Sequence, residues 1–247
     1  MSLPDRTSIS RQPVVIVGGF MTWPGLYHNL QATLKKLTGQ SIVVVNIYPW
    51  HWIFAIFPAG WKLILNKIKR AVSSKAHQSP TKKVTLIGHS AGGVMSRLFL
   101  AGDPFRGTVF NGKEQVNYLI TLGSPHYNYI GAWMRKWVEK KYPGAYFSKS
   151  VRYVSVAGKA VQGKLDGSLT EKQKFVIYKF LSNQGNEWGD GVVPLSSALL
   201  KGASWIILPG VRHFSLIKGK WYGTPQVVQQ WWSKWLNESE KNENRII

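Results

Sequence analysis

Residues 84–93 constrain the fold of this chain more than any other stretch of its sequence. The apolar run 84–87 is typical of a buried strand and leads directly into Gly-His-Ser-Ala-Gly at 88–92. The apolar run 94–100 then has the character of a helix. Because the two glycines lack Cβ atoms, the strand and the returning helix can pass close together at a sharp turn. The order of strand, Gly-x-Ser-x-Gly turn and helix predicts a nucleophile elbow with Ser90 at its tip.

Short apolar runs recur along the chain, separated by helical or irregular segments. We expect strands at 13–20, 42–47, 84–87, 118–122, 151–157 and 205–208, and helices at 27–37, 170–181 and 225–236. Continuous apolar runs of this length, joined by crossovers, are typical of a parallel sheet buried on both faces. The sequence therefore predicts an α/β fold, with a mostly parallel central sheet and helices on both faces.

The chain divides into a flexible arm at 1–12, a single domain at 13–236 and a polar tail at 237–247. Three segments exceed a minimal α/β core, near 48–61, 125–146 and 158–186, and the first two are rich in aromatic residues. Each begins at the carboxyl end of an expected strand, where the loops of a parallel sheet surround the ligand crevice. We expect them to surround Ser90 as a cap or lid.

The chain is strongly basic, with 32 Lys and Arg against 11 Asp and Glu and a net charge of +21. This balance favours a polyanionic partner, and the 12 Trp favour an anionic membrane surface over nucleic acid. The chain has no cysteine, and its six histidines are scattered, so we expect no metal and no cofactor. The first residues lack the apolar stretch of a secretory signal, which favours a cytoplasmic protein that is peripheral on a membrane.

A serine hydroxyl needs a base to act as a nucleophile at neutral pH. On an elbow scaffold the residues follow in the order serine, carboxylate, histidine. Two histidines follow Ser90. His213, just after the last expected strand, is the predicted base. His126 precedes every good acid candidate, so we interpret it as part of the pocket wall.

The predicted acid is Asp190, which lies between two glycines and can occupy a tight turn that aims at the histidine. Asp166 lies in the same interval and is the main rival. Glu187 is a weaker alternative, and Asp103 ends the helix after Ser90 and is expected to point away. Any of these side chains could instead be a solvated turn carboxylate.

Acyl transfer also needs donors that stabilise a developing oxyanion. One is the backbone N–H of the residue after the nucleophile, here Ala91, and the other comes from the loop after the first core strand. In the loop 18–21 we assign this donor to Phe20, with Met21 as the second choice.

The chain resembles the α/β-hydrolases, most closely their lipase and esterase branch. The resemblance spans residues 13–236 and is carried by Gly-His-Ser-Ala-Gly-Gly at 88–93, Leu-Gly-Ser-Pro-His at 122–126 and Asp-Gly-Val-Val-Pro at 190–194, with His213. More loosely, the chain is similar to lipase-like hydrolases of cyanobacteria and plastids, and to inositol-deacylase-like proteins. The resemblance implies hydrolysis of an acyl ester by Ser90, Asp190 and His213. Gly18-Gly19 departs from the His-Gly found in many lipases, although the backbone donor is retained.

The sequence thus predicts a serine hydrolase that cleaves lipid acyl esters at a membrane surface through an acyl-enzyme. We expect Met21, Trp50, His126 and Trp133 to contact the substrate. A soluble esterase, a thioesterase or an acyltransferase would use the same residues and remains the alternative. A third hypothesis is a protein that binds membrane or nucleic acid and has no catalytic turnover. The sequence does not determine the oligomeric state.

Overall fold

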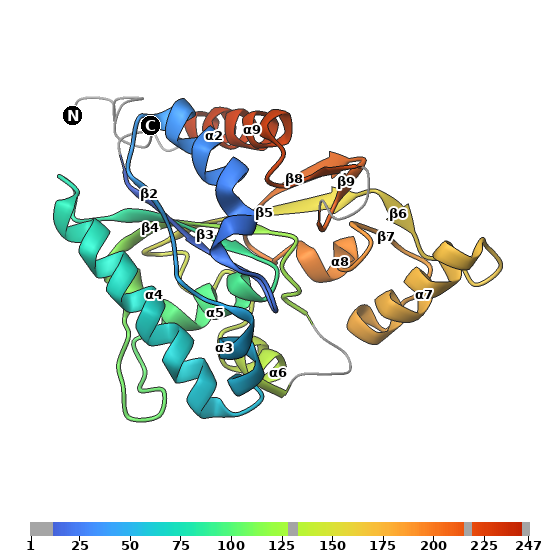
Figure 1. The fold of residues 1–247 in the computed structure, drawn as a ribbon, viewed down its shortest axis with the longest axis horizontal. Helices are drawn as coiled ribbons and strands as arrows, with labels where there is room; N and C mark the ends of the chain where they lie inside the picture. The colour runs from blue at the N-terminus through green and yellow to red at the C-terminus, as the bar shows by residue number, and fades with distance from the viewer. Residues whose placement is uncertain (1–11, 128–132, 215–218, 244–247) are drawn as a thin grey trace.

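A computed structural model describes residues 12–127, 133–214 and 219–243, with side chains through residue 237. Its centre is a six-stranded parallel sheet in the order β2-β1-β3-β4-β5-β8 (Figure 1). The strands are β1 (Val14–Val17), β2 (Ile42–Val44), β3 (Val84–His89), β4 (Val116–Leu122), β5 (Arg152–Lys159) and β8 (Ser204–Pro209). Every strand expected from the sequence lies in this sheet, and the predicted α/β fold class is confirmed.

Helices cover both faces of the sheet (Figure 1). One face packs against α2 (His28–Thr38) and α9 (Pro225–Glu243), and its core is rich in tryptophan from α9. The other face packs against α4 (Pro58–Gln78), α5 (Ala91–Phe99) and α6 (Trp133–Lys141). Since both faces of the sheet are covered, the strands carry apolar residues on both sides. Their sequences are therefore continuous apolar runs.

Shorter elements complete the fold. They are the turns η1 (Pro24–Tyr27) and η2 (Gly112–Glu114), the helices α3 (Pro49–Phe54), α7 (Leu169–Ser182) and α8 (Leu195–Ala198), and the strands β6 (Val161–Gln162), β7 (Trp188–Gly189), β9 (Val211–Arg212) and β10 (Lys220–Trp221). The β6–β7 and β9–β10 pairs form two small separate sheets. The helix α7 extends outward at the right of Figure 1.

Some boundaries differ from the sequence prediction. The aromatic segment 48–61, in which no helix was expected, forms α3 and the first turn of α4, each with a proline at its first helical position. The last helix continues through Glu243, past the expected domain end at 236. The predicted arm at 1–12 lies outside the described residues except for Gln12, which is buried. No helix within the described ranges is long and apolar enough to cross a bilayer.

Candidate active site

Ser90 lies at the turn between β3 and α5 in a strained backbone conformation. Its φ of 53° and ψ of −128° fall where a residue with a side chain is rarely found. The turn is held by close packing, because a Cβ on Gly88 would lie 2.4 Å from Gly93 Cα and one on Gly92 would lie 2.3 Å from Val17 O. Strain of this kind costs about 1–3 kcal/mol and persists where the surrounding structure enforces it. The predicted nucleophile elbow therefore has the expected backbone geometry.

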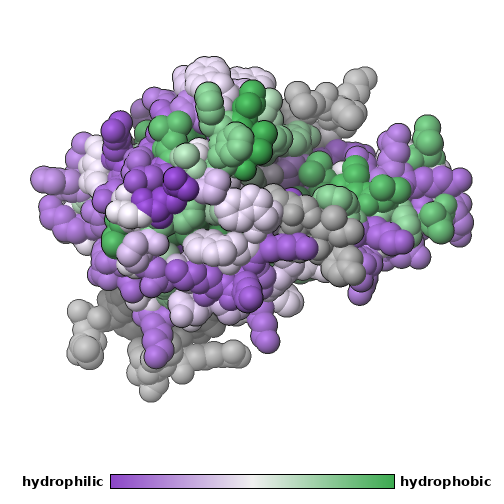
Figure 2. Space-filling model, turned by 90° about the horizontal axis from the view of Figure 1, so that it is seen from below, coloured by the Kyte–Doolittle hydropathy of each residue, from purple (hydrophilic) through white to green (hydrophobic). Residues whose placement is uncertain are grey.

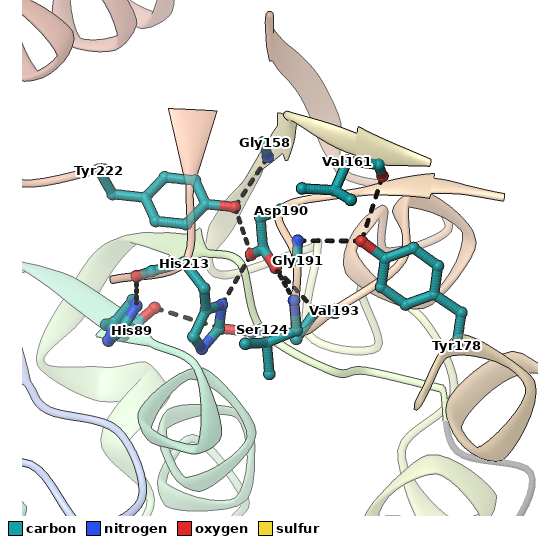
Figure 3. A network of polar contacts seen from close by, with 12 residues as sticks. His89, Ser124, Gly158, Val161, Tyr178, Asp190, Gly191, Val193, His213 and Tyr222 are labelled. Carbon is teal, nitrogen blue, oxygen red and sulfur yellow. Dashed lines mark hydrogen bonds and ion pairs between the residues drawn. The ribbon is translucent and has the colours of Figure 1, made fainter. Parts of the chain in front are cut away.

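Asp190 sits in the turn after β7 with its carboxylate fully hydrogen bonded. Oδ1 accepts from the backbone N–H groups of Val192 and Val193, at 2.9 and 2.7 Å. Oδ2 accepts from Nδ1 of His213 at 2.7 Å and from the hydroxyl of Tyr222 at 2.8 Å. Figure 3 shows this carboxylate between the Tyr222 ring and the 191–193 turn. A carboxylate held by four donors has a fixed orientation toward the histidine.

Two tyrosines hold the surroundings of Asp190 in place. The Tyr222 hydroxyl also accepts from Gly158 N at 2.7 Å, and burial together with the Asp190 charge raises the pKa of Tyr222. This hydroxyl therefore remains a donor to the carboxylate. On the other side, the Tyr178 hydroxyl of α7 accepts from Gly191 N at 2.9 Å and donates to Val161 O (Figure 3). The acid is thus tied to the sheet and to the α7 segment.

His213 is buried directly after β9, and its backbone N–H donates to Asp190 O at 3.0 Å. With Nδ1 bound to the Asp190 carboxylate, its other ring nitrogen is available. Within the described part of the chain, Nε2 has no hydrogen-bond partner, Ser90 Oγ included. Contacts between a base and its nucleophile are often long before substrate binds. A buried, oriented imidazole with one free nitrogen is the form that a general base requires.

His89, the residue before Ser90, links three loops of the site. Its Nε2 lies 3.2 Å from His213 O, and its Nδ1 lies 2.9 Å from the Tyr27 hydroxyl, which accepts from Gly19 N at 2.8 Å. Burial and the neighbouring His213 lower the pKa of His89 well below 6.5, so the ring is neutral. The Tyr27 hydroxyl donates its one proton to Thr22 Oγ1 at 3.1 Å, and a neutral His89 ring carries one N–H. The loops that carry Ser90, His213 and Gly19 are therefore linked through the His89 ring and Tyr27.

The loop after β1 lies directly against the elbow. A Cβ on Gly19 would be 2.7 Å from Ser90 Cβ and 3.2 Å from His89 O, so only glycine allows this approach. Among the residues that the structure describes, the backbone N–H groups of Phe20 and Ala91 donate no hydrogen bond. Two unoccupied N–H groups beside a nucleophile fit the predicted oxyanion donors.

An apolar cavity of about 700 Å³ opens over Ser90. Such a volume is within the range of small-molecule sites, about 300–1,000 Å³. Each of the three predicted insertions supplies part of its wall. The lining comprises Phe20, Trp52, Ala55, Ile56, Trp61, Ser90, Ala91, Val94, Pro125, Trp133, Met134, Arg135, Val176, Ile177, Phe180, Leu181, Val192 and Val193.

Of the four residues expected to contact substrate, Trp133 lines this cavity, whereas Met21, Trp50 and His126 do not. The interpretation of His126 as a wall residue is corrected, because it is absent from the lining and its ring is buried between Thr121 Oγ1 at 3.0 Å and Arg97 Nη1 at 3.5 Å. Trp50 instead stacks on Tyr48, with ring centroids 4.6 Å apart. Met21 is exposed and has a left-handed φ of 58°.

The rival acids lie elsewhere. Asp166 is exposed in the loop before α7, and Asp103 accepts from the Tyr142 hydroxyl at 2.8 Å and pairs with Lys141 at 3.4 Å. Glu187 accepts a hydrogen bond from Ser182. None of the three bonds to a histidine within the described ranges. In those same ranges, no group of His, Asp and Glu side chains could hold a metal ion.

Sequence reasoning missed Tyr222, Tyr178, Tyr27 and Arg135. The three tyrosines carry no motif, and each reaches the site from a distant part of the chain. Arg135 stands in a run of basic residues, so its position on the cavity wall leaves no separate signal in the sequence.

Comparisons with known proteins agree with the fold. The family described as "PGAP1-like alpha/beta domain" matches residues 61–176, just under half of the chain. An alpha/beta hydrolase enzyme from the metagenome of sediments of the lagoon of Mar Chica, Morocco, is 15% identical, with a TM-score of 0.50 over 93% of this chain and 92% of the enzyme. No curated protein sequence matches the chain.

Two further solved structures are less similar to this chain. A putative hydrolase of the alpha/beta superfamily from Xanthomonas campestris is 9% identical, with a TM-score of 0.49 over 89% of this chain and 99% of that protein. An acetylxylan esterase is 16% identical, with a TM-score of 0.36 over 48% of this chain and just 65% of the esterase. The chain has the α/β-hydrolase fold.

Proposed function

We propose that this chain is a serine hydrolase that cleaves lipid acyl esters at a membrane surface, with Ser90 as nucleophile, His213 as base and Asp190 as acid. The observation that carries the proposal is the His213 ring, which is buried, bound through Nδ1 to Asp190 and free at Nε2 within the described residues. An imidazole held in this way orients its free nitrogen for proton transfer.

In the first half of the reaction, Ser90 Oγ attacks the carbonyl carbon of the ester while His213 Nε2 takes its proton. The resulting oxyanion is stabilised by the N–H groups of Ala91 and Phe20. Collapse of the tetrahedral intermediate breaks the bond to the alcohol, which leaves with the proton from His213, and the acyl group remains on Ser90. Asp190 stabilises the imidazolium formed on His213.

In the second half, water attacks the acyl-enzyme. His213 accepts a proton from the water and returns it to Ser90 Oγ as the fatty acid leaves. The neutral state of His89 supports this cycle, because a second charged imidazole, with its ring centroid 4.8 Å from that of His213, would oppose protonation of the base.

The surface around the cavity supports a membrane substrate. Seven large apolar side chains that line the cavity are also exposed: Phe20, Ile56, Trp133, Val176, Ile177, Phe180 and Val192. Figure 2 shows apolar residues gathered over the α7 segment at the right and over a second area toward the top of that face. Exposed apolar groups beside a site favour lipid contact. With a net charge of +21, basic residues near anionic headgroups would add about 1 kcal/mol each.

The test is release of fatty acid from vesicles of glycolipid, phospholipid or triacylglycerol, with Ser90→Ala as the matched control. We expect release by the wild-type protein and a loss of at least about 10³-fold in Ser90→Ala. Release that persists in Ser90→Ala would reject Ser90 as the nucleophile. Activity on dispersed short-chain esters alone, with no release from any vesicle, would reject the lipid substrate and favour a soluble ester or thioester.

Binding to the membrane is tested separately by pelleting with anionic vesicles. We expect pelleting at low ionic strength and its loss in moderate salt, because salt screens exposed charges beyond about 10 Å at 0.1 M. Pelleting that is indifferent to salt would contradict the electrostatic contribution.

A further inference from the structure

Among the residues that the structure describes, the wall of the cavity carries one charged side chain. Apart from Ser90 and Arg135, every described residue of the lining is apolar. A single cation in an apolar cavity fixes the orientation of a ligand, because an anionic group of the ligand has one charged partner to bind there. Arg135 shares this cavity with Ser90, so one substrate molecule can contact both.

Arg135 lacks a counter-ion within the described part of the chain. No ion pair or hydrogen bond is formed by its guanidinium there, although Glu139 lies one helical turn away on α6. That carboxylate instead pairs with Arg97 at 3.3 Å, on the inner side of the helix. Burial lowers the pKa of Arg135, with no charged neighbour among the causes. Because a guanidinium remains charged at neutral pH, it is left without compensation in apolar surroundings.

Hydrogen bonds from Arg97 anchor the helix that carries Arg135. The buried Arg97 guanidinium bonds to Glu139 Oε2 at 3.3 Å, to Tyr142 O at 2.6 Å and to Gly144 O at 3.3 Å. These bonds fix the end of α6 and the residues that follow it. On the cavity side, Trp133 and Met134 flank Arg135 in the lining. The guanidinium therefore belongs to an anchored wall rather than to a freely moving surface segment.

We propose that Arg135 binds an oxyanion of the substrate, a phosphate or a carboxylate, while the acyl ester of the same molecule lies at Ser90. This inference rests on the proposed function and narrows it to acyl esters that carry an anionic group. The planar guanidinium can bind either oxyanion through two parallel hydrogen bonds, which a lysine cannot do. Arg135 thus determines specificity and takes no part in proton transfer.

The experiment measures binding of three ligands with the same alkyl chain by titration calorimetry, below their critical micelle concentrations. Dodecyl phosphate and dodecanoate carry the two oxyanions, and dodecanol is the neutral reference. We expect wild-type protein to bind one of the anions at least about tenfold more tightly than dodecanol, since charge-assisted hydrogen bonds are the strong ones. The anion that binds more tightly shows which oxyanion Arg135 recognises, the phosphate of a headgroup or the carboxylate of a free acid.

The variants separate Arg135 from the overall charge of the protein. Arg135→Met should abolish the preference for the anion and leave dodecanol binding within about twofold. Arg135→Lys keeps the charge and should retain only part of the preference. Lys136→Met is the matched control, because it removes one positive charge from an exposed neighbour outside the lining. An equal loss in Lys136→Met and Arg135→Met, or no preference in the wild-type protein, would overturn the inference.

Failure of the proposed function has a different signature. Binding needs no turnover. An Arg135-dependent preference for the anion without fatty-acid release would therefore reject the proposed hydrolase function and support the anion site. Hydrolysis that is abolished in Ser90→Ala, without an Arg135-dependent preference, would support the hydrolase function and reject the anion site. Should Arg135→Met fail to fold, the comparison of Arg135→Lys with Lys136→Met still decides.

Discussion

The polar cluster and the cavity wall of this protein are built in opposite ways. Asp190 and His213 are each 2% exposed, and every oxygen of the carboxylate is hydrogen bonded. In the wall, Phe180 and Ile56 are 46% and 66% exposed. Asp190 and His213 directly follow the short strands β7 and β9, whereas much of the wall comes from the inserted segments that contain α3, α6 and α7. A rigid polar centre suits one chemistry, while an apolar wall can change with the substrate.

The comparison also separates two kinds of energetic cost. Removing one partner from the polar cluster leaves a buried polar group unsatisfied, which costs about 1–3 kcal/mol before any effect on rate. Shortening an exposed apolar side chain in the wall removes contact area and leaves no unpaired group behind. We therefore expect substitutions in the cluster to reduce turnover, and substitutions in the wall to change substrate preference.

The largest effect is expected from Asp190→Asn. The amide keeps the shape but has one acceptor oxygen, so it cannot accept both from the 192–193 N–H groups and from His213 Nδ1. With the NH2 group toward His213, the histidine loses its tautomer and orientation. We expect ester hydrolysis to fall by about 10⁴-fold. Asp166→Asn is the matched control, because it removes the rival acid from an exposed loop. Initial rates on a soluble ester measure both variants, and a larger loss in Asp166→Asn would reassign the acid.

A smaller effect is expected from Gly19→Ala. Its Cβ would lie 2.7 Å from Ser90 Cβ, so the oxyanion loop must move away from the nucleophile. We expect a fall in kcat of about 10²–10³-fold, the range for loss of one oxyanion donor. Gly39→Ala is the control for stability, because it strains a left-handed helix cap with nothing within 4 Å. Wild-type kcat in Gly19→Ala would show that this loop does not form the oxyanion hole.

In the wall, Phe180→Ala should act on long acyl chains alone. We expect KM for a dodecanoyl ester to rise by about tenfold, because a contacting phenyl group is lost, while a butyryl ester is unaffected within twofold. Leu169→Ala, on the same helix but outside the lining, is the control. Steady-state kinetics on the two esters make the comparison. An equal rise in KM for both esters would mean that Phe180 does not select for the length of the acyl chain.

The smallest effect concerns His126, which is buried and lies outside the cavity lining. Burial, followed by the charge of Arg97, lowers the pKa of His126 well below 6.5. The unfolded chain therefore binds a proton that the folded chain does not, so stability is complete above about pH 6.5 and falls as pH decreases below it. Between pH 6.5 and 5.5, His126→Gln should lose about 1 kcal/mol less free energy of unfolding than the wild type.

Urea denaturation at the two pH values measures this difference. The amide of His126→Gln can replace both hydrogen bonds without titrating. His77→Gln, an exposed position on α4, serves as the control and should follow the wild type. An identical loss in His126→Gln and wild type would mean that His126 does not contribute to acid sensitivity.

Much of the fold could be predicted because its signals are local. The six sheet strands are short, continuous apolar runs, and the elbow is specified within 84–93 by small residues at a tight turn. The helix α3 was missed because aromatic residues in 48–61 obscure a helical period. Asp190 and His213 were predicted from chain order alone, and their hydrogen bond joins residues 23 apart in sequence.

The sequence by itself determined the α/β class, the elbow at Ser90 and the order of the candidate residues, since each depends on spacing along the chain. Only the tertiary structure decided which side chains meet. It placed Tyr222 on Asp190 and buried His126 outside the cavity lining. Among the described residues, it left Arg135 without a counter-ion in an apolar wall. Such contacts depend on how distant segments pack, and neither the periodicity nor the charge of a segment specifies its distant neighbours.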